Sequence, residues 1–250
     1  MNIRRIALLS ISGLMVACTA TKDNKSNYTQ PDKVAVERPA KERAQTLTEL
    51  GLAYYQLEKY IYALEYLDES LALDASNATT YQIIGLINMR QNLPDQAQIS
   101  FDKALKIEPD NFDILTNYAV FLYGQERYEE SLDAFKRVVN APFYKQKWTA
   151  YTYLGLSDLK RGQKGEAEKK FYYALKINKD YAPALLETAR IRYGKGDMMS
   201  ARAFIERYFA SAGKTLEGLQ LAIKIENALQ DRDMTEQYQL ELKRAFPYAD

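Results

Sequence analysis

Apolar residues recur along most of the chain at helical spacing, and the pattern itself repeats over a longer period. Two sets of small residues and one set of large apolar residues keep the same intervals of 34, 34, 36 and 34 residues. Such a period is typical of a pair of helices that stacks on the next pair. The three columns are Gly51, Gly85, Ala119, Gly155 and Ala189; Ala63, Ala97, Ser131, Ala167 and Ala201; and Leu67, Phe101, Phe135, Phe171 and Ile205.

The columns predict how the two helices of each pair meet. Small side chains let two helix axes approach closely, so we expect the small column of the first helix to face the small column of the second. The large apolar column then fills the space beside that contact. Residues 44–215 are predicted to form five such repeats. Residues 216–250 keep helical periodicity without the columns, so they are predicted to be a degenerate sixth repeat whose helices cap the stack.

Several short segments resemble the consensus of the tetratricopeptide repeat. They are residues 50–54, 60–67, 105–109 and 128–135, with Pro109 at the place where it would end a second helix. No segment has the alternating pattern of a strand. The resemblance implies an all-α fold, a right-handed superhelix (α-solenoid) of about six helix pairs.

The first residues have the layout of a secretory signal. Arg4 and Arg5 precede an apolar run of about eleven residues, too short to cross a hydrocarbon core that needs roughly twenty. The run ends at Cys18, and residues 15–18 resemble the bacterial lipobox, which implies a signal peptide over 1–17 and an acylated Cys18. A plain signal peptide with an accidental cysteine is the alternative. Thr19 in place of aspartate resembles the signal for the outer membrane, on its periplasmic face.

The segment from the lipidated cysteine to residue 43 is polar and contains two prolines, so residues 18–43 are predicted to be a disordered tether. No second long apolar stretch follows it. We therefore expect the mature chain to be held at the membrane by its N-terminal lipid anchor alone.

Composition narrows the chemistry further. The chain has no histidine and one cysteine, which excludes disulfides, histidine acid–base catalysis and the common zinc sites, so we expect no metal and no cofactor. A formal net charge of +1 gives no argument for a nucleic-acid partner. Glu129 and Glu130 are adjacent, and adjacent helical residues point in different directions, as on a solvated face. We predict a non-catalytic binding protein.

The resemblance to tetratricopeptide arrays also predicts a partner-binding groove. In such arrays the first helix of each pair lines the concave surface, and the residues one and four places after the small column project into it. Here these positions are apolar, which suits an extended or helical peptide. The alternative is that these residues belong partly to the core. The predicted groove residues are Leu52, Tyr55, Leu86, Met89, Val120, Tyr123, Leu156 and Leu159.

A second candidate contact lies in the two-residue insertion between the third and fourth repeats. Phe143, Tyr144 and Trp148 stand there beside two lysines, and aromatic residues dominate interface energetics. In the alternative interpretation, these aromatics pack a long turn against the repeats.

The lipobox, the tether and the repeats, together with residues 127–131, 140–144, 184–187 and 225–229, resemble the pilotins of the PilF/PilW family, lipoproteins of type IV pilus biogenesis and stability. The resemblance implies a monomer that binds the type IV pilus secretin and promotes its localisation or multimerisation at the outer membrane. A tetratricopeptide lipoprotein that scaffolds cell-wall enzymes or takes part in outer-membrane protein assembly is the alternative.

Overall fold

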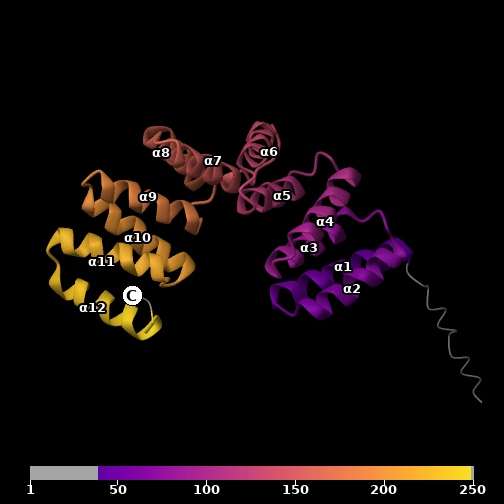
Figure 1. Cartoon of the computed structure of the whole chain (residues 1–250), viewed down its shortest axis with the longest axis horizontal. Helices are drawn as coiled ribbons and strands as arrows, with labels where there is room; N and C mark the ends of the chain where they lie inside the picture. The colour runs from indigo at the N-terminus through magenta and orange to yellow at the C-terminus, as the bar shows by residue number, and fades with distance from the viewer. Residues whose placement is uncertain (1–38, 249–250) are drawn as a thin grey trace, which may run out of the picture. The chain divides into compact units, whose positions relative to one another are not determined.

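The chain folds into a series of helical hairpins. The computed structural model describes residues 39–248, which contain twelve α-helices and no strand (Figure 1). This confirms the all-α solenoid. The helices are α1 (Ala40–Gln56), α2 (Tyr60–Leu73), α3 (Ala78–Arg90), α4 (Pro94–Ile107), α5 (Phe112–Gly124), α6 (Tyr128–Asn140), α7 (Trp148–Lys160), α8 (Lys164–Ile177), α9 (Ala182–Gly194), α10 (Met198–Ala212), α11 (Leu216–Leu229) and α12 (Arg232–Ala245).

The predicted signal peptide (1–17) and Cys18 lie outside the described residues, as does most of the predicted tether. The tether prediction, 18–43, extends too far, because α1 begins at Ala40 and residues 40–43 are helical. Each odd-numbered helix packs against the even-numbered helix that follows it, and each hairpin packs against the next. First helices also contact one another, as α1 does α3 and α5 does α7.

The glycines of the first helices face large side chains of the second helices. A Cβ added at Gly85 would lie 3.1 Å from the Phe101 ring, and one added at Gly155 would lie 2.8 Å from the Phe171 ring. The small residue therefore makes room for the large apolar column itself. The two small columns also face each other, since a Cβ added at Gly51 would lie 3.3 Å from the Ala63 carbonyl oxygen. They meet again in the third hairpin, where the Ser131 hydroxyl donates to the Ala119 carbonyl over 2.7 Å.

The turn inside each hairpin has a left-handed residue just after the first helix. In the third hairpin this residue is Glu126, at φ 61°, whose N–H donates to the Tyr123 carbonyl over 3.1 Å. The next N–H, from Arg127, donates to the Leu122 carbonyl over 2.9 Å, which completes a Schellman motif. The same pair of bonds recurs in the other five hairpins. The left-handed residues are Glu58, Asn92, Glu126, Gly162, Gly196 and Gln230.

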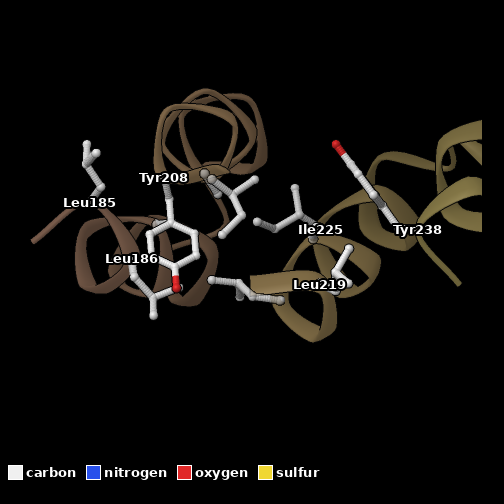
Figure 2. Packing of buried hydrophobic residues seen from close by; sticks show 11 residues of the cluster. Leu185, Leu186, Tyr208, Leu219, Ile225 and Tyr238 are labelled. Carbon is white, nitrogen blue, oxygen red and sulfur yellow. The ribbon is translucent and has the colours of Figure 1, made fainter. Parts of the chain in front are cut away.

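The sixth hairpin keeps this turn although it lacks the side-chain columns, since Gln230 stands 34 residues after Gly196. Its helices α11 and α12 share a buried cluster with α9 and α10, drawn in Figure 2, in which Leu186 and Tyr208 lie together. Asp231 caps α12 by accepting the Met234 N–H over 3.1 Å. The end of the array is thus fastened by the same apolar contacts that join the other hairpins.

A buried ion pair also joins the last two hairpins. Glu226 on α11 is only 1 % exposed, and its carboxylate accepts from the Nε of Arg202, on α10, over 3.0 Å and from the same guanidinium at Nη2. The Nη2 group also donates to Asp231 over 2.9 Å. Because the guanidinium binds both carboxylates, it neutralises charge that would otherwise be buried without a partner.

We expect Glu126→Gly to stabilise the protein by about 0.5–1 kcal/mol, because a Cβ is unfavourable at this left-handed position and glycine removes it. Gly162→Ala should destabilise it by about 1 kcal/mol for the converse reason. The measurement is the midpoint of urea unfolding, monitored by circular dichroism, and the slope of the transition should not change. Glu108→Gly, at φ −127°, is the matched control and should give no gain. A gain in stability from Glu108→Gly equal to that from Glu126→Gly would show that the left-handed backbone is not the cause.

Arg202→Met should destabilise the end of the array by about 3–5 kcal/mol, because it leaves the Glu226 carboxylate buried and unpaired. Hydrogen exchange should then quicken in α11 and α12 more than in α1 to α4, since each hairpin packs mainly against its neighbours. Arg232→Met, on the exposed face of α12, is the matched control. Equal protection of the α11 amides from exchange in the two variants would show that the ion pair between Arg202 and Glu226 is not needed to stabilise the end of the array.

Candidate partner-binding surfaces

The eight predicted groove residues all lie on first helices, two each on α1, α3, α5 and α7. Their spacing along each helix is three residues, which places the two members of a pair on one face. First helices contact one another from α1 to α7, so these faces follow each other along the array. The structure therefore places the predicted residues in equivalent positions of successive hairpins.

All eight are partly buried, and most of them pack against clusters of buried apolar residues. Leu86 and Met89, for example, pack against a cluster that contains Phe101 and Phe121. Leu156 and Leu159 pack against a different cluster, around Phe171. Seven of the eight residues thus join four separate clusters, Tyr123 being the exception, and all eight keep part of their surface accessible. Their role in binding a partner stays a prediction.

Tyr123 packs against several side chains of its own protein, so it contributes to the fold as well as to any contact with a partner. Its ring meets Tyr128 and Tyr153 edge-on, at centroid distances of 5.1 and 4.9 Å. The ammonium of Lys160 lies 5.0 Å from the Tyr123 ring and 3.7 Å from that of Tyr128. Burial raises the pKa of Tyr153 to about 12. This cluster links α5, α6 and α7, so a charged substitution at Tyr123 would disturb the fold as well as a contact.

The aromatic insertion divides into one exposed and two packed residues. Phe143 is 93 % exposed and projects from the connection between α6 and α7. Tyr144 packs its ring on Phe112 at 5.6 Å and donates its hydroxyl to Asp113 over 2.7 Å. Trp148 packs against the cluster around Phe171. Burial, followed by the hydrogen bond to Asp113, raises the pKa of Tyr144. Of the three predicted contacts, Phe143 alone is fully available to a partner.

Sequence reasoning missed the exposed apolar residues of the second helices. Large apolar side chains that are more than half exposed occur on α2, α4, α8 and α10. They lie one or two positions from a column of the repeat, as Tyr172 lies next to Phe171. The signal that could have identified them is an apolar residue of a second helix that belongs to none of the three columns. These residues are Ile61, Tyr62, Ile99, Tyr172 and Met199.

The described residues contain no cluster of three or more histidine, cysteine, aspartate or glutamate side chains with the geometry of a metal site. Between residues 39 and 248, none of the helices combines the length and the hydropathy of a membrane span.

Known proteins resemble this chain in sequence. The tetratricopeptide repeat family matches residues 84–145. The type IV pilus assembly protein PilF of Pseudomonas aeruginosa is 28% identical over 199 residues, which cover 80% of this chain and 79% of PilF.

Solved structures extend the likeness to three dimensions. The structure of Pseudomonas aeruginosa PilF superposes with a TM-score of 0.75 at 27% identity, covering 84% of this chain and 95% of that one. PilW, described as a widely conserved type IV pilus biogenesis factor, gives a TM-score of 0.69 at 28% identity, covering 83% and 95%. The sequence and the fold of this chain are therefore similar to those of PilF and PilW over most of its length.

Proposed function

We propose that this chain is an outer-membrane lipoprotein that binds the type IV pilus secretin and promotes its localisation and multimerisation. The observation that carries the proposal is the extent of the similarity, which covers 80% of this chain in sequence and 84% in structure. A likeness over the whole array supports a role in type IV pilus biogenesis, whereas a single repeat would support only the fold.

The proposed action is that of a non-catalytic adaptor. Partly buried apolar residues on successive first helices offer several small contacts in a row, which suits an extended or helical segment of a partner. An acyl chain on Cys18 would hold the bound partner at the membrane. Tethering of this kind raises the local concentration of the partner without any new contact.

Capture of the full chain from detergent-solubilised envelopes of a piliated strain should recover the secretin. Met89→Gln should lower this recovery at least about fivefold, because it puts a polar group of similar size into an apolar contact. The matched control is Ile99→Gln, an exposed position on the second helix of the same hairpin. Circular dichroism melts of both variants check that they are folded.

Phe143→Ala tests the second candidate contact in the same assay and should leave stability within about 0.5 kcal/mol, since the side chain is exposed. Recovery of cell-wall enzymes in place of the secretin would contradict the proposed function. Secretin recovery that falls with Phe143→Ala and not with Met89→Gln would move the site to the insertion.

Cys18→Ser should abolish acylation and release the chain from the outer membrane, because serine offers no thiol for the lipid. Thr19→Asp should redirect the chain to the inner membrane. Density-gradient fractionation with labelled palmitate measures both effects, and Ala20→Ser is the control. A Cys18→Ser variant that stays in the outer-membrane fraction would refute the lipid anchor.

A further inference from the structure

A pocket of about 290 Å³ lies where the fourth hairpin meets the fifth, on α8, α9 and α10. None of the residues predicted from the sequence to bind a partner lines it. Its walls combine three apolar side chains with three cationic ones. They are Tyr172, Leu175 and Phe204, and Lys176, Arg192 and Arg207.

The base of the pocket belongs to the core and its rim is open. Leu175 packs against the apolar clusters of both hairpins, so this side chain is fixed by the junction itself. Tyr172, one turn earlier on α8, is 62 % exposed. Phe204 reaches the same space from α10 and is partly buried against the cluster around Leu185. An incoming apolar side chain would therefore meet a rigid floor and an aromatic rim.

The charge of the pocket is positive. Glu168 is its one carboxylate, and it is already engaged by Arg192 at 2.9 Å and by Lys195. The Nε of Arg192 is buried and has no hydrogen-bond partner among residues 39–248. The guanidinium of Arg207 lies 5.3 Å from the centre of the Phe204 ring. Lys176 and Arg207 form no ion pair with any carboxylate of the described hairpins, and Arg207 donates one hydrogen bond, from Nη2 to the Lys179 carbonyl.

The preceding junction is built differently at the equivalent positions. Thirty-four residues before Phe204 and Arg192 stand Lys170 and Asp158. These two form an ion pair across α8 and α7, so the cation and the carboxylate satisfy each other there. The apolar and cationic pocket is therefore a property of the junction between the fourth and fifth hairpins and is not imposed by the repeat.

We propose that this pocket binds a segment of a partner protein in which an aromatic side chain is flanked by carboxylates. The aromatic side chain would pack between Tyr172 and Phe204, as aromatic pairs do at interface centres. The carboxylates would accept hydrogen bonds from Lys176 and Arg207, and charge-assisted bonds of this kind are the stronger ones. This surface goes beyond the proposed function, because it holds whether or not the partner is a secretin.

Fluorescence anisotropy of the full chain with a labelled peptide, Glu-Asp-Phe-Glu-Asp, tests the proposal. We expect saturable binding that weakens as salt rises, since the screening length falls from about 10 Å at 0.1 M to 3 Å at 1 M. The peptide with serine in place of phenylalanine, and the peptide with lysines in place of all its acidic residues, should each bind at least about tenfold more weakly, a loss of about 1.4 kcal/mol or more.

Lys176→Glu and Arg207→Glu should each lower the affinity for the acidic peptide at least about tenfold. Both side chains are exposed, so neither change disturbs the core. Lys224→Glu, an exposed lysine on α11, makes the same change of net charge and should leave the affinity within about twofold. Absence of saturable binding, equal binding of the three peptides, or equal affinity of the three variants would each overturn the proposal.

Discussion

Each of the first five hairpins depends on one contact between unequal residues. A large apolar side chain of the second helix lies against a position of the first helix that has almost no side chain, as Phe101 does at Gly85 and Phe171 at Gly155. The third and fifth hairpins use Ala119 and Ala189 at this position. Because the two helices lie so close, the core of each hairpin is thin, and the hairpin must bury further apolar surface against the next one.

The period of this contact made the architecture predictable. Side chains that touch must keep their type, so the columns appear in the sequence and count the hairpins. The turn inside each hairpin is equally regular in the structure, but glycine or asparagine marks it in the sequence of only three of the six hairpins. Its left-handed residue is glutamate at Glu58 and Glu126, and glycine at Gly162 and Gly196. The left-handed conformation goes with the place of the residue at the end of the first helix, because the Schellman bonds form there whether or not the residue is glycine.

Candidate sites were less predictable, because exposure depends on neighbours that the local sequence does not contain. Helical spacing placed Leu86 and Met89 on one face, yet Phe121, from the following hairpin, decides how much of them stays accessible. In the insertion, Phe143 is exposed, whereas Tyr144 is held by Asp113, 31 residues before it, which accepts the tyrosine hydroxyl. Phe204 belongs to none of the columns, and its surroundings arise from three different helices.

The stacking of hairpins also separates the surfaces energetically. Each hairpin contacts little beyond its neighbours, so a charge added at α8 or α10 has no direct path to the apolar faces of α1 and α3. In our proposals, the apolar first-helix faces would therefore bind one segment of a partner and the basic pocket at Arg207 another. Two weak contacts on one chain act together through their effective concentration, provided that the linker between the two segments spans the distance. An array of this kind can thus bind a partner firmly without any single deep site.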